Sequence, residues 1–383
     1  MGQLWVLSWG LGADSTVILL RWLTEPSSRE FALEDLVVVA AMTGDEFAET
    51  IELCERHVLP RLRDAGVRLV QVARGGRSVG DGVVVLDDSR RPTRLYGDGA
   101  YKLSDELLSA GTVPMVASGR RTCTAKAKGV PLDWVIEQLT GGEAFTHVIG
   151  FECDEQGRAD RDRSYSSVAR ASRYPLIEWG WDRAACQAYL ESVTGVVSWP
   201  KSCCVYCPFS ANRGNLATHL ARYAREPDAA LLALRIERAS RALNARMTLY
   251  GSKSVEDLLV AGGLGRLVDE LDARLATEEH VVMDVRRVLV AKGRGWRSTR
   301  VVFRGSRDSC AAELRRLAAE VGSEIETDAE AVRLWLRRRG DDGVSAERFF
   351  VVVPGRVEPK QRPGFERVWS RAVGDGRLFA VAV

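Results

Sequence analysis

The chain of 383 residues lacks the features of a secreted or membrane-spanning protein. Its first residues, Met1 to Trp5, contain no basic segment, and the nearest apolar run, Thr16 to Leu20, is far too short to cross a bilayer. Its eight cysteines are too sparse for a disulfide scaffold in a chain of this length. These absences predict a cytoplasmic protein with no membrane partner.

An excess of charge of one sign is also missing, because 54 Lys and Arg oppose 52 Asp and Glu. The net charge of +2 excludes a surface that attracts polyanions as a whole. The charge is nevertheless uneven: residues 281–383 carry a net +7 and residues 1–280 a net −5. The basic C-terminal third, with Trp296, Trp335 and Trp369 among its arginines, indicates either a module that contacts nucleic acid or a partner, or an Arg-rich solvated surface.

Strand-like and helix-like segments alternate through the first half of the chain. Near-continuous apolar runs with β-branched residues predict buried parallel strands, at residues 4–8, 36–42, 67–72, 145–151 and 174–179. Helical periodicity predicts helices between and after them, at residues 14–23, 47–65, 183–195 and over most of 211–276. This alternation predicts an α/β fold with a doubly wound parallel sheet.

Changes in composition divide the chain into three expected domains. Residues 1–210 form the α/β domain, with an insertion or lid at residues 75–120, where Gly and Asp are frequent. Residues 211–278 form a helical extension. Residues 279–383 form a smaller basic α+β domain with shorter strands around one helix at residues 311–321.

The turn after the first expected strand has the composition of an anion-binding loop. Residues 8–16 read Ser-Trp-Gly-Leu-Gly-Ala-Asp-Ser-Thr. Glycines let backbone N–H groups approach a phosphate, and the helix that follows adds a partial positive charge. The segment has no Lys, which excludes the GxxxxGK[ST] loop. A capped turn without a ligand is the alternative. The candidate phosphate-binding residues are Ser8, Gly10, Gly12, Asp14, Ser15 and Thr16.

A second polar segment follows the strand expected at residues 36–42. It reads Thr43-Gly44-Asp45-Glu46-Phe47-Ala48-Glu49-Thr50 and falls at the carboxyl edge of the sheet, where open α/β sheets bind ligands. Together the two segments resemble the PP-loop ATP pyrophosphatase superfamily, in its phosphoadenosine-phosphosulfate-reductase-like branch. That branch has Asp where this chain has Met42, so Asp45 or Glu46 would have to replace it. The resemblance implies an adenine nucleotide alpha hydrolase-like fold and adds Thr43, Gly44 and Glu49 to the nucleotide site.

Further segments extend the resemblance over roughly residues 3–215. They are Arg120-Arg121-Thr122-Cys123 with Lys126 and Lys128, then Gly150-Phe151-Glu152, then Tyr174-Pro175-Leu176. The basic residues would bind a triphosphate or sulfate, because Arg grips such groups in a bidentate manner. Asp14 or Asp45 would hold Mg²⁺ that bridges phosphates. The expected catalytic residues are Asp14, Ser15, Arg121 and Lys126.

Three cysteines lie within the five residues 203–207, a C-x-x-C preceded by one more Cys and followed by Pro. The pattern occurs in some iron–sulfur proteins, whereas a zinc ribbon would need a second such pair. The resemblance, which includes DNA phosphorothioation ATPases, implies an iron–sulfur cluster of the 4Fe–4S type on Cys123, Cys204 and Cys207, with Cys203 as fourth ligand or one iron left open. Structural zinc or plain buried thiols are the alternatives. Cys54, Cys186 and Cys310 are expected to be ordinary buried residues.

The resemblance implies an ATP-dependent, pyrophosphate-releasing enzyme of sulfur transfer that thiolates a nucleic acid or small molecule. Its partners would be ATP, a sulfur donor such as a cysteine desulfurase, and nucleic acid at the C-terminal domain. A sulfonucleotide reductase is the first alternative, although the chain ends Leu378-Phe379-Ala380-Val381-Ala382-Val383 and lacks the Glu-Cys-Gly-x-His tail of those enzymes. A non-catalytic nucleotide-binding module of a modification or defence complex is the second.

Overall fold

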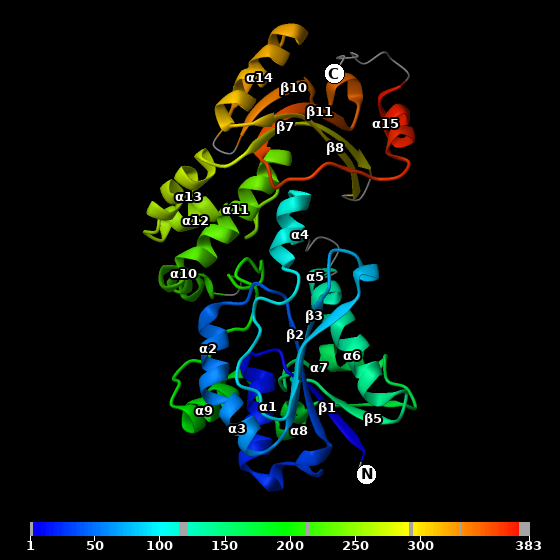
Figure 1. Ribbon diagram of the computed structural model, residues 1–383, viewed down its shortest axis with the longest axis vertical. Coiled ribbons are helices and arrows are strands. Elements are labelled where there is room, and N and C mark those ends of the chain that lie inside the picture. Colours follow the sequence, from blue (N-terminus) through cyan, green and yellow to red (C-terminus); the bar gives the residue numbers. More distant parts are fainter. Residues whose placement is uncertain (1–2, 115–121, 212–213, 291–293, 329–330, 375–383) are drawn as a thin grey trace. The chain divides into compact units, whose positions relative to one another are not determined.

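The computed structural model describes residues 3–114, 122–211, 214–290, 294–328 and 331–374 (Figure 1). The chain divides into two compact units, residues 1–103 with 121–205, and residues 104–120 with 206–383. The helices within residues 211–278 thus belong to the same unit as the C-terminal sheet. The expected boundaries at residues 210 and 278 stay predictions.

A mixed six-stranded sheet forms the centre of the first unit, in the order β4-β3-β2-β1-β5-β6. Five strands are parallel and β4 pairs with β3 in the antiparallel sense at one edge. The strands are β1 (Leu4–Ser8), β2 (Leu36–Met42), β3 (Arg68–Arg74), β4 (Val83–Ser89), β5 (Phe145–Val148) and β6 (Arg170–Arg173). The predicted α/β class with a largely parallel sheet is confirmed, and β4 occupies part of the expected insertion.

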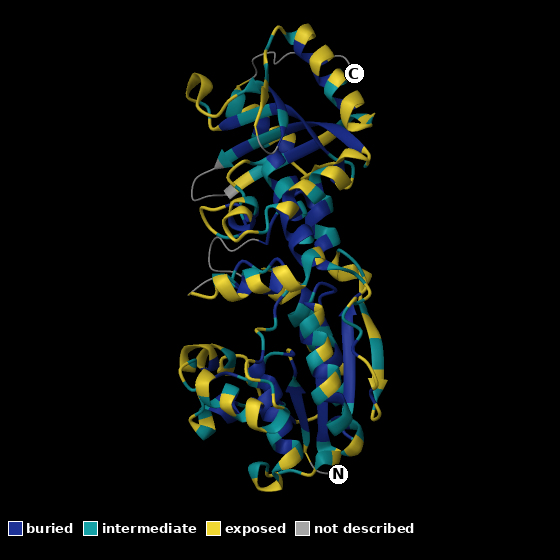
Figure 2. Ribbon diagram, turned by 90° about the vertical axis from the view of Figure 1, so that its left-hand side faces the viewer, coloured by how far each residue is buried: buried dark blue, intermediate teal, exposed yellow. Residues whose placement is uncertain are grey.

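Helical layers cover both faces of this sheet, so successive side chains of β2 enter two different cores. Leu36, Val38 and Ala40 pack into the cluster on one face, and Val37 and Val39 pack into the cluster on the other. This explains why β2 is hydrophobic throughout instead of alternating. The inner strands of this sheet are accordingly dark blue in Figure 2.

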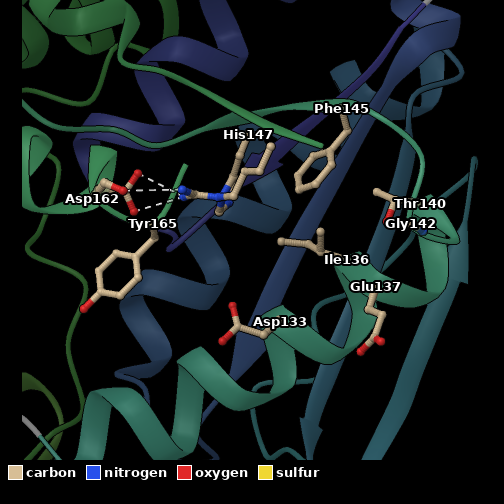
Figure 3. Close-up of a pocket in the computed structure, with 10 residues that line it drawn as sticks. Asp133, Ile136, Glu137, Thr140, Gly142, Phe145, His147, Asp162 and Tyr165 are labelled. Carbon is tan, nitrogen blue, oxygen red and sulfur yellow. Dashed lines mark hydrogen bonds and ion pairs between the residues drawn. The ribbon is translucent and has the colours of Figure 1, made fainter. Parts of the chain in front are cut away.

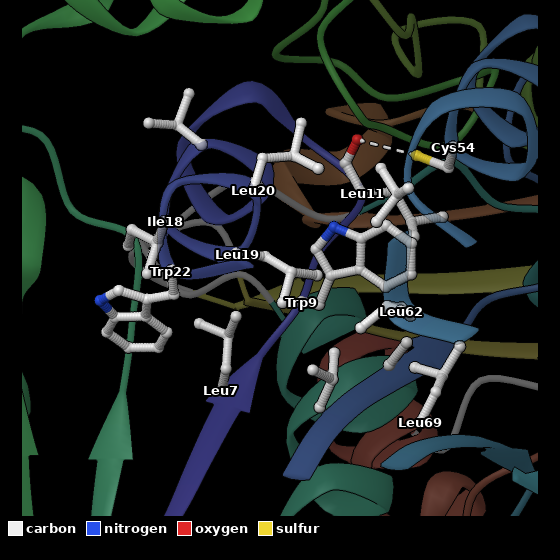
Figure 4. Packing of buried hydrophobic residues seen from close by; sticks show 14 of the residues in the cluster. Leu7, Trp9, Leu11, Ile18, Leu19, Leu20, Trp22, Cys54, Leu62 and Leu69 are labelled. Carbon is white, nitrogen blue, oxygen red and sulfur yellow. Dashed lines mark hydrogen bonds between the residues drawn. The ribbon is translucent and has the colours of Figure 1, made fainter. Parts of the chain in front are cut away.

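The larger core gathers apolar side chains of helix α1 (Ala13–Thr24) over the sheet (Figure 4). Ile18, Leu19 and Leu20 are fully buried there, together with Leu7 of β1. The other helices of this unit are α2 (Ala48–His57), α3 (Leu59–Asp64), α5 (Thr122–Thr124), α6 (Val130–Thr140), α7 (Gln156–Arg163), α8 (Pro175–Trp179) and α9 (Arg183–Thr194). Short 3-10 turns lie at Pro26–Ser28, Leu33–Asp35 and Val79–Asp81, and a π-helical turn at Ala125–Gly129.

Two expectations about this unit are wrong, and proline explains both. Residues 174–179 are not a strand: α8 begins at Pro175, whose ring suits the first helical position, and ends before Gly180 in the left-handed conformation. Residues 47–65 are not one helix, because Pro60 cannot donate to the helical ladder. The chain breaks at Val58 into α2 and α3.

The second unit contains an antiparallel six-stranded sheet in the order β12-β8-β7-β11-β10-β9. Its strands are β7 (His280–Val290), β8 (Arg294–Gly305), β9 (Ile325–Thr327), β10 (Val332–Arg337), β11 (Ala346–Pro354) and β12 (Lys360–Gln361). The expectation of shorter strands holds for β9 and β12, which have 3 and 2 residues, but it is wrong for β7 and β8, which have 11 and 12. The β7–β8 hairpin contains Arg and Gly residues, which weaken the apolar pattern by which a strand is predicted from the sequence.

The helices of the second unit include those expected at residues 211–276 and 311–321, and two that were not expected, at residues 103–110 and 365–373. They are α4 (Leu103–Ala110, all but its first residue), α10 (Leu216–Arg225), α11 (Pro227–Leu243), α12 (Val255–Ala261), α13 (Arg266–Ala276), α14 (Arg307–Val321) and α15 (Phe365–Val373). Helix α14 covers one face of the sheet through a core that includes Leu314 and Leu334. Arg333, the neighbour of Leu334 in β10, points to the opposite face and binds the end of α11.

Most arginines described in the basic strands of this unit are neutralised. Arg286 pairs with Glu366, Arg287 with Glu347, and Arg348 with Asp284. The rings of Trp335 and Trp369 also contact other side chains of the protein. Trp369 is 6% exposed and packs on Phe365 in a small core, and Trp335 lies between Phe349 and Arg338. This arrangement gives the predicted nucleic-acid contact no direct support.

Arg333 fixes the C-terminus of α11 to the sheet, and replacing it should cost stability. Its Nε lies 3.2 Å from the Ala242 carbonyl oxygen and Nη2 2.7 Å from that of Arg241, and the side chain is almost fully buried. Arg333→Met leaves both carbonyls without these donors and should lower the free energy of unfolding by about 2 kcal/mol. Urea unfolding measures the change.

Arg316→Met is the matched control for that substitution. Arg316 lies exposed on α14 and bonds Glu313 and Glu320 in its own helix. Such surface pairs contribute little, so the urea midpoint should hardly move. Equal midpoints for the two variants would contradict the assigned role of Arg333.

Candidate active site

Strand β1 marks the point where the order of the first sheet reverses. The chain proceeds from β1 to β2 and β3 on one side, and later adds β5 and β6 on the other side of β1. Loops that leave the carboxyl ends of β1 and β5 therefore diverge and leave room between them, which is where open α/β sheets bind ligands. Ser8 ends β1 and Val148 ends β5.

The turn after β1 is closed by its own side chains. The Gly10 N–H donates to Ser15 Oγ at 3.1 Å, and the Trp9 indole N–H donates to Thr16 Oγ1 at 3.0 Å. Ser15 and Thr16 are buried, so these hydroxyls hold the turn against the start of α1. At Gly10 a Cβ atom would meet nothing within 4 Å, so the backbone there borders open space.

Leu11 holds the turn in an unusual backbone conformation. Its φ is +62°, a region that side chains other than glycine rarely adopt. The Leu11 carbonyl oxygen accepts a hydrogen bond from Trp199 Nε1 at 3.3 Å and contacts Cys54 Sγ at 3.7 Å (Figure 4). The conformation is thus fixed by residues far away in the sequence.

Two carboxylates meet beside this turn. Asp14, in the first turn of α1, and Glu152, after β5, both pair with Arg183 at the start of α9, at 2.8 Å and 2.7 Å. Gly150 permits the approach, since a Cβ on it would lie 2.8 Å from the Ser15 backbone nitrogen. Asp14 Oδ1 and Glu152 Oε1 are buried, and neither accepts a hydrogen bond of normal geometry.

The environment of Glu152 makes its carboxyl group hold a proton. Burial, together with the hydrogen-bonded and negatively charged Asp14, raises the pKa of Glu152 to about 8, and Arg183 only partly opposes this. Two carboxyl groups in contact cannot both ionise without cost. A divalent cation placed between them would remove that cost.

The turn after β2 brings a third carboxylate to the same edge of the sheet. The N–H and Oγ1 of Thr43 donate to Glu46 Oε1 at 3.2 Å and 2.8 Å. Cys204 Sγ lies 3.3 Å from Thr43 Oγ1, and the backbone at Cys204 bridges to Glu46. Glu46 Oε2 is buried without a hydrogen-bond partner. Gly44 has a φ of +89°, and a Cβ there would press on the Asp98 carbonyl.

The remaining predicted residues of the nucleotide site are less closely arranged. Lys128 approaches Glu46 at 3.9 Å, and Lys126 is exposed on the π-helical turn. Glu49 is half-buried in the first turn of α2, and Gly12 caps α1 with no side-chain hydrogen bond to that helix. Arg120 and Arg121 lie outside the described residues.

The predicted cluster ligands do not form an evident metal site. Across the described ranges, no three Cys, His, Asp or Glu side chains lie together as a metal centre would require. Cys203 is buried, and Cys123, Cys204 and Cys207 are half-buried. Cys54, Cys186 and Cys310 are buried as expected. Burial and nearby carboxylates raise the pKa of Cys186 to about 12.

Two site residues gave no usable signal in the sequence. Arg183 lies far along the chain from Asp14 and follows an ordinary helix cap, Asp182. His147 sits within β5 and hydrogen-bonds Ser8, although the strand pattern marks it only as one more sheet residue. Glu152 and Glu46 stand in noted segments, but only the fold brings Glu152 to Asp14.

No protein-family model matches the chain, and no curated protein matches it. Within the described residues, no helix is long and apolar enough to cross a membrane.

The proton on Glu152 predicts a stability that declines as pH rises. The pKa of this group is raised from 4.5 to about 8, so the folded protein keeps a proton that the unfolded chain loses between these values. The free energy of unfolding should therefore fall across this window. Glu152→Gln should remove that part of the slope, roughly 2 kcal/mol after solvent screening.

Urea unfolding of both proteins from about pH 4.5 to about pH 8 measures the difference. Glu320→Gln is the control, because that exposed carboxylate lies on α14 in the second unit, pairs with Arg316 and should leave the slope in place. A wild-type slope that survives in Glu152→Gln would disprove the raised pKa of Glu152.

Proposed function

We propose that the protein is an ATP-dependent, pyrophosphate-releasing enzyme of sulfur transfer, with an adenine nucleotide alpha hydrolase-like fold. One observation carries the proposal: the turn after β1 borders open space at the point where the sheet order reverses, and the Asp14–Glu152 carboxyl pair lies beside it. Phosphate groups and Mg²⁺ together fit a site with backbone donors and two carboxyl groups.

The phosphates would lie on the backbone at Gly10 and the N-terminus of α1. Ser8 Oγ and the helix N–H groups would donate to them, and the helix dipole would favour their negative charge. Ser15 and Thr16 would act indirectly, because their hydroxyls hold Gly10 and Trp9 in place. Lys126 and Arg121 would contribute positive charge, as the resemblance to PP-loop enzymes implies.

Asp14 and Glu152 are the residues that would hold Mg²⁺. Their oxygens already attract one positive charge, because Arg183 lies 2.8 Å from Asp14 Oδ1 and 2.7 Å from Glu152 Oε1. This pairing and the raised pKa of Glu152 support a cation site. Bound Mg²⁺ would supply positive charge against the developing phosphate charge. Arg183 pairs with both carboxylates and would hold them in position to bind the ion.

The reaction would proceed in two displacements. An oxygen of the acceptor attacks the α-phosphorus of ATP, the bond to the bridging oxygen breaks, and pyrophosphate leaves. The adenylated oxygen is then a good leaving group: the terminal sulfur of a persulfide, from a donor such as a cysteine desulfurase, attacks the acceptor atom that carries this oxygen, and AMP leaves. A second thiol then attacks the S–S bond to the donor, which releases the thiolated acceptor and leaves a disulfide. The turn and its cations would stabilise the negative charge that develops in the first displacement.

The other predicted components keep the support they have from sequence. The iron–sulfur cluster on Cys123, Cys204, Cys207 and Cys203 stays a prediction, and no reaction step above depends on it. A cytoplasmic location suits an enzyme that uses ATP. Nucleic acid recognised by the C-terminal unit stays one of the possible acceptors.

Pyrophosphate release from ATP, measured with the anaerobically purified protein, tests the proposal. We expect release that depends on Mg²⁺ and on a nucleic acid or small-molecule acceptor, and a brown protein with bound iron if the cluster prediction holds. Sulfite release from adenylyl sulfate with a thiol would instead show the reductase. ATP binding without pyrophosphate release from any acceptor would leave a binding module.

Asp14→Asn should abolish pyrophosphate release while the protein stays folded. The amide keeps the shape of the side chain but removes the charge that would hold Mg²⁺, so we expect a loss of about a hundredfold or more in turnover. Asp160→Asn is the control, because Asp160 pairs with Arg163 on the exposed surface of α7. Full turnover in Asp14→Asn would refute the cation site.

A further inference from the structure

A cavity of about 520 Å³ lies on the α6 face of the first sheet, beside the candidate site (Figure 3). His147 points into it from β5, Asp133 faces it from α6, and Asp162 and Tyr165 border its other side. The further lining residues are Ile136, Glu137, Thr140, Gly142, Phe145 and Arg170. His147 connects this cavity to the turn, because its Nε2 lies 2.8 Å from Ser8 Oγ.

The contacts of His147 determine which ring nitrogen carries its proton. Arg170 approaches Nδ1 with both Nε, at 3.0 Å, and Nη2, at 2.8 Å. A guanidinium group can only donate hydrogen bonds. Nδ1 must therefore accept and carry no proton, which leaves the proton of the neutral ring on Nε2.

Arg170 is itself held in one orientation. Asp162 binds Arg170 Nη2 through both carboxylate oxygens, at 3.0 Å and 2.9 Å. The same carboxylate accepts hydrogen bonds from Tyr174 Oη at 2.8 Å and Ser172 Oγ at 3.2 Å. The partners on Asp162 leave Arg170 little freedom to rotate away from His147.

The surroundings also keep His147 neutral. The ring is buried, and burial with the positive charge of Arg170 lowers the pKa of His147 to about 4, which Asp162 opposes only in part. The other carboxyl groups that face the cavity are Asp133 and Glu137 of α6. Burial raises the pKa of Asp133, which reduces the negative charge that it presents to the ring.

A neutral ring with its proton on Nε2 fixes the role of Ser8. Since Nε2–H donates, Ser8 Oγ accepts, and the hydroxyl proton of Ser8 must point away from His147. Ser8 ends β1 and immediately precedes the open turn at Gly10. We propose that His147, fixed by Arg170 and Asp162, is a positioning residue that turns the Ser8 hydroxyl into a hydrogen-bond donor for a nucleotide phosphate. This inference rests on the proposed function.

The tautomer can be tested without any ligand. Long-range ¹⁵N–¹H spectra of protein labelled at its four histidines report which ring nitrogen is protonated. Loss of one set of signals in His147→Gln assigns His147. We expect a ring protonated on Nε2 and bare on Nδ1 at neutral pH. A proton on Nδ1, or a charged ring, overturns the inference.

The effect on Ser8 is tested by a double-mutant cycle. Calorimetry would measure the affinity for Mg²⁺ with α,β-methylene-ATP, which cannot release pyrophosphate. Ser8→Ala and His147→Asn should each weaken binding roughly tenfold. Because both act through one hydrogen bond, the double variant should bind no more weakly than Ser8→Ala. His147→Gln, whose amide can still donate toward Ser8, should recover part of the affinity.

Two controls separate this mechanism from occupation of the cavity itself. Tyr165→Phe and Glu137→Gln alter the lining without touching His147 or Ser8, and they should leave the affinity unchanged. Weaker binding in these controls, or additive losses in the double variant, would overturn the inference.

The remaining outcomes distinguish the inference from the proposed function. A wild-type protein that binds no nucleotide analogue contradicts the proposed function and with it the phosphate role of Ser8, whereas the spectra still decide the tautomer. Thermal unfolding of each variant shows whether it is folded. If His147→Asn fails to fold, the spectra of the wild type and the Ser8→Ala affinity decide.

Discussion

The parallel pairing of β1 with both β2 and β5 is the constraint on which the first unit depends. A strand paired on both sides has its backbone polar groups satisfied, and its side chains must then be covered on both faces. The helical layers do this, and each connecting helix returns the chain to the same end of the sheet. All the polar turns that follow the parallel strands therefore gather at one edge.

Charge is distributed unevenly along that edge, and this sets what the site can bind. Between β1 and β5, Glu152 lies against Asp14 and Arg183, and burial together with Asp14 raises the pKa of Glu152. After β2, a third carboxylate is buried with one oxygen that accepts no hydrogen bond. The α6 side of the same strands contains the Asp162–Arg170–His147–Ser8 chain, in which each group is oriented by the one before it. The Asp14–Glu152 pair and the Glu46 carboxylate suit cations. The chain that ends at Ser8 instead orients a hydrogen-bond donor for an anion.

The pattern of the sequence predicts the layers better than it predicts the site. Apolar runs such as Leu36 to Met42 located the strands because burial on both faces leaves no polar position. The hydropathy pattern fails at Pro175 and Pro60, since it registers neither the missing N–H nor its effect on a helix. The turn at residues 8–16 was placed at the strand end by its glycines. Arg183 and His147 could not be predicted, because their roles depend on contacts with residues far apart in the sequence.

The turn after β1 also has a consequence for how the protein reaches its working form. Its left-handed residue, Leu11, depends on the indole of Trp199 and the thiol of Cys54 to hold its carbonyl oxygen. All residues of the motif are synthesised before the last of these anchors, which follows 188 residues after Leu11. A nascent or truncated chain that stops before Trp199 would contain the complete motif without its shape. The turn thus acquires its shape only when the whole α/β unit has folded.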